Sequence, residues 1–159
     1  MSYSTILDRE IATDCATAIQ TKNAFYDTLE KIYSMYSERD DFLNRNIAVL
    51  EITDKVLADL KKELDKVNAF HSDRQEDLTA QQEEVLDLLK EWWKVFIQEA
   101  TQNQIMSSRF IKKIKGVEPY SVWAQFSDAR RGRKFNRREN YLLKKIAKFS
   151  AKQFQYIIS

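Results

Sequence analysis

Glycine and proline are nearly absent from this chain, and their scarcity limits the folds that it can adopt. Among 159 residues there are two glycines and one proline, and they are Gly116, Pro119 and Gly132. Glycine and proline form most tight turns and interrupt helices, so a chain that lacks them favours long helices and few connections. No alternating strand pattern of useful length is visible. We therefore expect an all-α fold.

The apolar content is consistent with one compact unit. A chain of 159 residues that is 43% hydrophobic can bury a real core within one domain. We predict a single helical domain over residues 1–159, in which an acidic long-helix bundle (1–115) precedes a basic helical end (116–159). The predicted architecture is an elongated antiparallel three-helix bundle with two shorter C-terminal helices.

The first long helix is predicted from about residue 4 to about residue 37. Apolar residues recur along it at seven-residue spacing, with Lys22 as the one polar break. Cys15 lies on this stripe, so we expect a buried structural thiol, and a single cysteine excludes an intramolecular disulfide. The stripe contains Ile11, Ala18, Phe25 and Ile32, with Cys15, Leu29 and Tyr36 in the second position.

Two more long helices are predicted, over about residues 40–70 and 74–115. Capping-box patterns at Ser72-x-x-Gln75 and Asp73-x-x-Glu76 indicate where the later one begins. The face of the 40–70 helix contains Leu43, Leu50, Leu57 and Leu64 at seven-residue spacing, completed by Ile47, Val56, Leu60 and Val67. The face of the 74–115 helix contains Leu78, Val85, Leu89, Trp92, Phe96 and Phe110.

After residue 88 the 74–115 helix is apolar on more than one side, which indicates more than one covering neighbour. The C-terminal elements are the obvious candidates. Trp92 and Trp93 point about 100° apart on a helix, so they cannot both face one neighbour. We expect one of them to pack inside the bundle and the other to meet the fourth predicted helix, over about residues 119–130, or a second subunit.

Two shorter helices are predicted after this bundle. Gly116 suits a left-handed position at a helix C-terminus, and Pro119 stops the helix soon after. A helix over about residues 119–130 follows, and Gly132 marks the next break. The capping box Asn136-x-x-Glu139 then predicts a fifth helix over about residues 137–157.

Charge is divided sharply along the chain. Residues 1–100 contain 12 Lys/Arg and 21 Asp/Glu, whereas residues 101–159 contain 14 Lys/Arg and three acids, Glu118, Asp128 and Glu139. The local net charges are therefore −9 and +11, which nearly cancel in an overall charge of +2. A basic third joined to an acidic body indicates a polyanionic partner, either nucleic acid or an anionic membrane.

The densest positive charge lies around Gly132. Arginine forks are suited to bidentate phosphate contact, and the start of the fifth helix adds free amides and a positive dipole. On that helix the cations fill the arc opposite an apolar arc of Leu142, Leu143, Ile146, Ala147, Phe149, Phe154, Ile157 and Ile158. The predicted nucleic-acid contacts are Arg130, Arg131, Arg133, Lys134, Arg137, Arg138, Lys144, Lys145, Lys148 and Lys152, with Tyr141 among them.

Several functions remain open at this point. The favoured hypothesis is a non-enzymatic helical protein that binds DNA or RNA through this basic surface, without sequence specificity and as part of an assembly. The cations could instead pair with the acidic body. The alternative hypothesis is an adaptor or scaffold that forms a homo-oligomer, or that binds a protein partner through its heptad stripes. A variant of that alternative binds an anionic membrane surface.

Catalysis has little support in the sequence. Two isolated glycines cannot form a phosphate-binding loop, and no zinc-ligand set or HExxH motif is present, so we predict neither an enzyme nor a cofactor or metal. His71 is predicted to lie in a solvated hinge with no carboxylate pattern around it. The N-terminus lacks the pattern of a secretory signal, and no apolar run reaches about 18 residues, so we expect an intracellular, soluble protein.

Overall fold

The described part of the chain is all-α. The computed structural model describes residues 2–115, 137 and 140–148, and these residues form helices and turns with no strand. Three long helices follow one another: α1 (Tyr3–Met35), α2 (Phe42–Asp73) and α3 (Ala80–Lys115). A further helical stretch covers residues 140–148. The all-α prediction is confirmed, while the predicted helix at about residues 119–130 lies outside the described residues.

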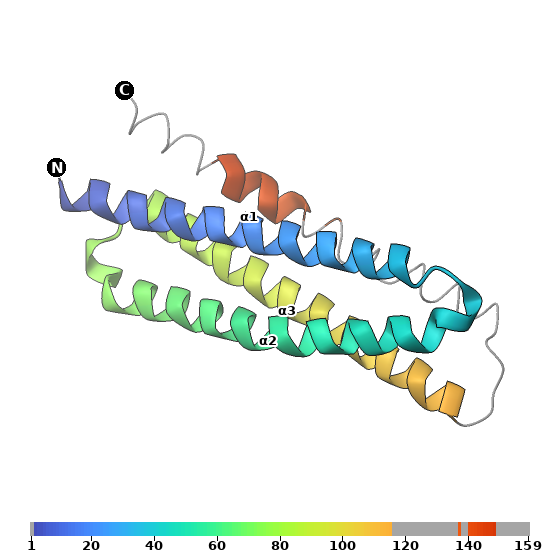
Figure 1. Ribbon diagram of the computed structural model, residues 1–159. Coiled ribbons are helices and arrows are strands. Elements are labelled where there is room, and N and C mark those ends of the chain that lie inside the picture. Colours follow the sequence, from blue (N-terminus) through green and yellow to red (C-terminus); the bar gives the residue numbers. More distant parts are fainter. Residues whose placement is uncertain (1, 116–136, 138–139, 149–159) are drawn as a thin grey trace.

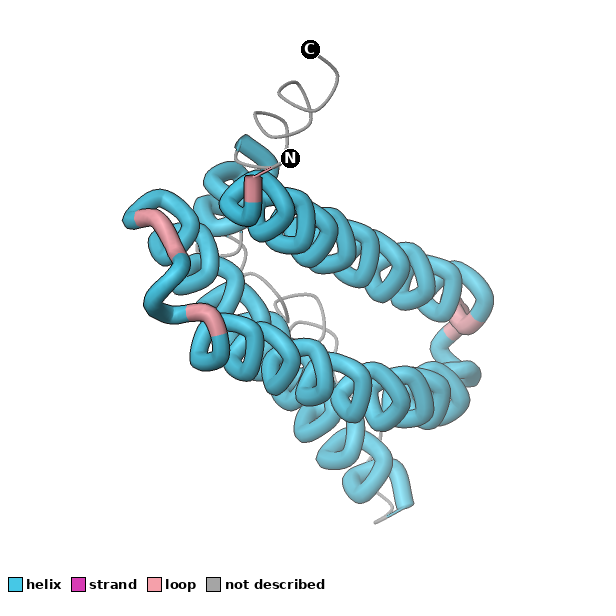
Figure 2. The backbone as a smooth tube through the Cα atoms, turned by 90° about the vertical axis from the view of Figure 1, so that its left-hand side faces the viewer, coloured by secondary structure: helices cyan, strands magenta, loops and turns pink. Residues whose placement is uncertain are grey.

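The three long helices lie side by side and alternate in direction, as Figure 1 shows. They contain 33, 32 and 36 residues. At 1.5 Å per residue each is about 48–54 Å long. Residues 140–148 run beside α1 in the opposite direction (Figure 1). The turns between the long helices gather at the two ends of the bundle (Figure 2).

Helix ends differ from the sequence prediction between α2 and α3. A 3-10 turn, η1 (Arg39–Asp41), precedes α2, and a second, η2 (Gln75–Asp77), separates α2 from α3. The expected capping boxes at Ser72 and Asp73 are wrong, because both residues still belong to α2. The actual capping box is Thr79 with Gln82: the Thr79 amide donates to Gln82 Oε1 (3.0 Å), and the Gln82 amide donates to Thr79 Oγ1 (3.1 Å).

The core face of α1 follows the seven-residue spacing. Its buried residues are Leu7, Ile11, Cys15, Ala18, Phe25 and Leu29. Phe25 meets Phe96 of α3 edge-on, with ring centroids 5.3 Å apart. The sequence prediction for this face, including the burial of Cys15, is confirmed up to Leu29. The two last residues of the predicted stripe, Ile32 and Tyr36, are only half-buried, and Tyr36 follows the end of α1.

The core face of α2 is rotated from the predicted one. Leu57, Leu60 and Val67 are buried as expected, but Ile47 is 39% exposed. Asn46 and Thr53 are buried instead, at 0% exposure. Each donates a hydrogen bond to its own helix: the Asn46 amide donates to the Phe42 carbonyl (2.8 Å) and the Thr53 hydroxyl donates to the Val49 carbonyl (2.8 Å). Asn46 Oδ1 is buried and has no hydrogen-bond partner among the described residues. Short polar residues can therefore occupy core positions that leucine spacing alone would not select.

The aromatic half of α3 is covered from more than one side, as predicted. Trp92 and Trp93 are both fully buried in one core cluster, with ring centroids 4.7 Å apart. Leu142 and Ile146 of the C-terminal stretch belong to the same cluster. Both tryptophans are thus buried within the single chain, in one continuous core. The predicted 119–130 helix, which one of them was expected to meet, lies outside the described residues.

Candidate polyanion-binding surface

The predicted contact residues divide into described and undescribed ones. Six of them lie outside the described residues: Arg130, Arg131, Arg133, Lys134, Arg138 and Lys152. The other five are Arg137, Tyr141, Lys144, Lys145 and Lys148, and all five are helical and exposed. We call these five residues the basic face.

An amphipathic helix presents the basic face to solvent. Leu142 and Ile146 are fully buried in the core cluster, and Leu143 packs against it. At 100° per residue the lysines and Tyr141 fall on the opposite arc. Ala147 was assigned to the apolar arc, but it is exposed. It lies 100° from Ile146 and 140° from Leu142 around the helix, at the edge of the apolar arc beyond the half-buried Leu143.

The cations of the basic face have no carboxylate partner within the described part of the chain. Among the described residues, neither Arg137 nor Lys144, Lys145 and Lys148 forms an ion pair with a carboxylate. Lys145 Nζ lies 5.7 Å from the centroid of the Tyr141 ring, and that ring is 48% exposed. The described part of this surface is therefore cationic, with one aromatic ring among the charges.

A polar pocket adjoins the start of the C-terminal stretch. Its volume is about 410 Å³, and its described lining comprises Lys22, Asn23, Tyr26 and Asp27 of α1 together with Asn140. Sequence reasoning missed the α1 side of this pocket because those residues lie more than 100 positions from Asn140. The one available signal was Lys22, which interrupts an otherwise apolar stripe.

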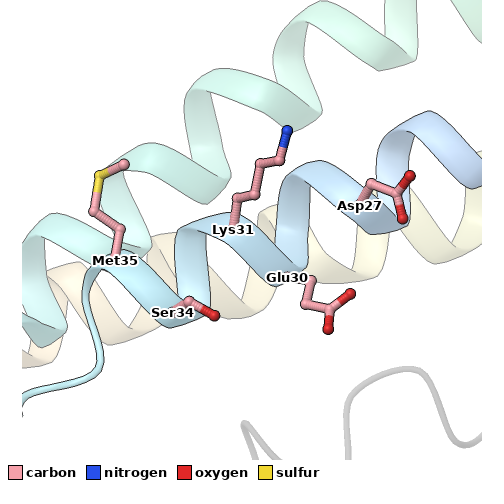
Figure 3. Close-up of a pocket in the computed structure, with 5 residues that line it drawn as sticks. All are labelled: Asp27, Glu30, Lys31, Ser34 and Met35. Atoms are coloured by element: carbon pink, nitrogen blue, oxygen red, sulfur yellow. The ribbon is translucent and has the colours of Figure 1, made fainter.

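A larger pocket of about 660 Å³ lies farther along α1. Figure 3 shows the five residues drawn at this pocket: Asp27, Glu30, Lys31, Ser34 and Met35. Their side chains fan out from the helix and do not converge on one point (Figure 3). Catalysis requires groups within hydrogen-bonding reach of a common atom, so this arrangement offers no reaction centre.

His71 lies in a different environment from the predicted one. It belongs to α2, and its side chain is only 15% exposed. An ammonium group can only donate, so His71 Nδ1 accepts from Lys90 Nζ, while Nε2 lies 3.5 Å from Glu83 Oε1. Asp87 approaches Nδ1 at 4.0 Å. The expectation of a solvated hinge histidine without carboxylates is wrong, because its partners come from α3 across the turn.

Two titratable groups on α1 have altered proton affinities. Burial, with the nearby carboxylates of Glu63 and Glu10, raises the pKa of Asp14 to about 6. Burial, with a smaller contribution from Asp14, raises the pKa of Cys15 to about 12. The Cys15 thiol is therefore protonated at neutral pH, which makes it a structural group and a poor nucleophile.

Neither a cluster of metal ligands nor a candidate membrane-spanning helix is found among the described residues. In residues 2–115, 137 and 140–148, no group of three or more His, Cys, Asp or Glu side chains is placed to hold a metal ion. Within the same residues no helix combines the length and apolarity that crossing a bilayer requires.

Comparisons with known proteins give no family to which the surface can be assigned. The chain matches no protein-family model, no curated protein and no solved structure.

Proposed function

We propose that this chain is a non-enzymatic helical protein that binds nucleic acid through its basic C-terminal surface. Contact with the phosphate backbone makes the binding independent of sequence, and the protein acts as part of an assembly. The surface comprises the basic face, extended by the cations at positions 130, 131, 133, 134, 138 and 152. The proposal treats residues 1–159 as one domain and retains a short helix at about residues 119–130.

The unpaired state of the described cations supports the proposal most directly. A surface whose charges served only to neutralise the acidic body would place its lysines against carboxylates. Within the described residues Arg137, Lys144 and Lys148 have no such partner. Four exposed cations on one arc repel one another, and a polyanion relieves that repulsion by replacing their counterions.

The shape of the surface also suits a linear polyanion. Lys144 and Lys148 lie one helical turn apart, about 6 Å along the axis. At 100° per residue Arg137 falls on the same arc as Lys144 and Lys148. An extended backbone of phosphates can contact such a row in sequence, whereas a small anion would use only one or two of its charges.

The test is a titration of labelled single-stranded and double-stranded DNA and RNA by fluorescence anisotropy at 50, 150 and 300 mM salt. The test variant replaces Arg137, Lys144, Lys145 and Lys148 by Gln. A matched control replaces Arg9, Lys55, Lys61 and Lys62 by Gln, which removes the same charge from exposed positions of α1 and α2. We expect the test variant to lose at least tenfold in affinity at 50 mM salt and the control to lose less than threefold.

Two outcomes would contradict the proposal. Absence of binding by the unaltered protein at 50 mM salt would remove nucleic acid as the partner. Equal losses of affinity in both variants would mean that binding depends on the overall charge of the protein and not on the basic face. The alternative proposal, an adaptor that oligomerises or binds a protein or an anionic membrane, would then be tested by light scattering and by sedimentation with acidic and neutral liposomes.

A further inference from the structure

The polar pocket and the Tyr141 ring lie on neighbouring positions of the C-terminal stretch. Asn140 lines the pocket, and Tyr141 follows it directly on the exposed arc. The pocket volume of about 410 Å³ falls within the usual range of small-ligand sites, about 300–1,000 Å³. A polar pocket and an exposed aromatic ring thus occupy consecutive positions at the start of the basic face, about 100° apart around the helix.

The chemistry of the pocket suits a base better than a phosphate. Asp27 contributes a carboxylate, which repels a phosphate but accepts hydrogen bonds from the exocyclic amino group of a base. Asn23 and Asn140 each offer an amide donor and acceptor, the groups that pair with base edges. Lys22 adds the one cation of the described lining, and it can contact the phosphate that accompanies the base.

The Tyr141 ring supplies the second element of recognition. Bases of a single strand stack on exposed aromatic rings, and this stacking tolerates any sequence because every base has a π-face. In a duplex the bases are already paired and stacked inside the helix, so neither the ring nor the pocket can reach them. Lysines 144, 145 and 148 would then bind the phosphates on either side of the stacked base.

We propose that the pocket lined by Lys22, Asn23, Asp27 and Asn140 binds an unpaired base and that Tyr141, the next residue on the helix, stacks on a base of the same strand, so that the basic face is a site for single-stranded nucleic acid. This inference rests on the proposed function and narrows it to one class of nucleic acid. Tyr141 is its specificity-determining residue, because the ring adds affinity for single strands only.

The experiment compares a 20-nucleotide single strand with the matching blunt duplex at 100 mM salt. The variants are Tyr141→Ala and Tyr141→Phe, with Tyr3→Ala as the control, since Tyr3 is 52% exposed at the start of α1. We expect Tyr141→Ala to weaken single-strand binding about 5- to 140-fold, which is about 1–3 kcal/mol at 1.4 kcal/mol per tenfold. Duplex binding should change by less than twofold, and Tyr141→Phe and Tyr3→Ala should behave as the unaltered protein.

A spectroscopic readout separates stacking from a general loss of affinity. A single strand that contains 2-aminopurine changes its fluorescence when that base stacks on an aromatic ring. We expect the change with the unaltered protein and with Tyr141→Phe, and we expect it to disappear with Asn23→Ala/Asn140→Ala and with Tyr141→Ala at saturating protein.

Each remaining outcome overturns a definite claim. If the unaltered protein binds both nucleic acids and Tyr141→Ala weakens them equally or not at all, the proposed function stands and the single-strand site is wrong. If the unaltered protein binds neither nucleic acid, both the function and the site are wrong. Circular dichroism melts of each variant identify any loss of binding that comes from unfolding. Retained binding by Tyr141→Phe would show that position 141 tolerates substitution when the aromatic ring is kept.

Discussion

At the scale of single residues, several buried polar side chains in the described part of the chain have a hydrogen-bonding neighbour. The Tyr26 hydroxyl donates to the Glu99 side chain, which is 1% exposed, so this polar group inside the bundle has a hydrogen-bond donor. Gln82, at 2% exposure, satisfies its side chain within its capping box and on α1. Asp14 departs from this pattern, since two of its neighbours, Glu63 and Glu10, are carboxylates that repel it.

Asp14→Asn is predicted to stabilise the fold at neutral pH. The pKa of Asp14 is about 6 in the folded state against 3.8 in the unfolded chain, so between these values the folded state binds more protons. The free energy of unfolding therefore falls as pH rises through that window. The variant avoids this loss, and after allowance for solvent screening we expect a gain of about 1 kcal/mol, or about 2–4 °C in Tm, at pH 7.5.

Urea denaturation at pH 7.5 and at pH 3.5 measures this difference. At the lower pH the carboxyl is protonated in both states and behaves much like the amide, so the gain should disappear. Asp65→Asn is the matched control, because Asp65 is an exposed acid of α2. An equal gain in stability from Asp65→Asn, or a gain from Asp14→Asn at pH 3.5, would show that the charge of Asp14 does not destabilise the fold specifically.

At the scale of elements, the start of α3 is joined to the start of α1. Besides its capping bonds, Gln82 donates through Nε2 to the carbonyl of Ser4 (3.1 Å) and to Asp8 Oδ1 (2.6 Å). A bond to a carboxylate is stronger than one between neutral groups. The Gln82 side chain thus both caps the start of α3 and links α3 to α1.

Gln82→Ala and Thr79→Ala are predicted to differ for that reason. Thr79→Ala removes only the cap, which costs about 0.5–2 kcal/mol. Gln82→Ala removes part of the cap and both bonds to α1, so we expect a loss of about 2–4 kcal/mol. Chemical denaturation measures both, with the exposed Gln81→Ala as control. Equal losses from the two variants would mean that the bonds to α1 contribute nothing to stability.

Local sequence signals located the helices better than they located helix ends and partners. Seven-residue apolar spacing predicted the α1 face because all the buried positions of α1 are occupied by apolar residues. It failed on α2, since Asn46 and Thr53 are buried by hydrogen-bonding to their own backbone. The neighbours of His71 lie on α3, and the α1 side of the polar pocket lies far from Asn140 in sequence. Such contacts depend on how helices pack, which periodicity within one segment does not encode.

Packing of the C-terminal stretch onto the core is predicted to depend on Leu142. This side chain is fully buried, and its truncation to alanine removes contacts worth about 2–5 kcal/mol. We expect Leu142→Ala to raise hydrogen exchange of amides in residues 140–148 strongly while α2 retains its protection. Lys144→Ala, an exposed change in the same helix, should leave exchange unaltered. Unchanged protection in Leu142→Ala would show that the stretch is held by other contacts.

At the scale of the whole molecule, the acidic and basic parts of the sequence lie largely in different helices. The first 100 residues, with a net charge of −9, supply α1, α2 and most of α3. The described C-terminal stretch, residues 140–148, runs beside α1 (Figure 1). Its lysines form no ion pairs with described residues. A polyanion that approaches the basic face therefore also experiences repulsion from the acidic helices beside it.

Neutralising exposed acids of the body is predicted to strengthen nucleic-acid binding. The variant replaces Glu51, Asp65, Glu76 and Glu84 by their amides, all at exposed positions of the body. If the basic face binds a polyanion, weaker repulsion should raise affinity about two- to tenfold at 50 mM salt, and the gain should shrink at 300 mM because salt screens separated charges. If the charge division instead joins acidic body to basic end between copies, the same variant should dissociate an oligomer in light scattering without improving binding. The two measurements on one variant therefore separate a ligand surface from an assembly surface.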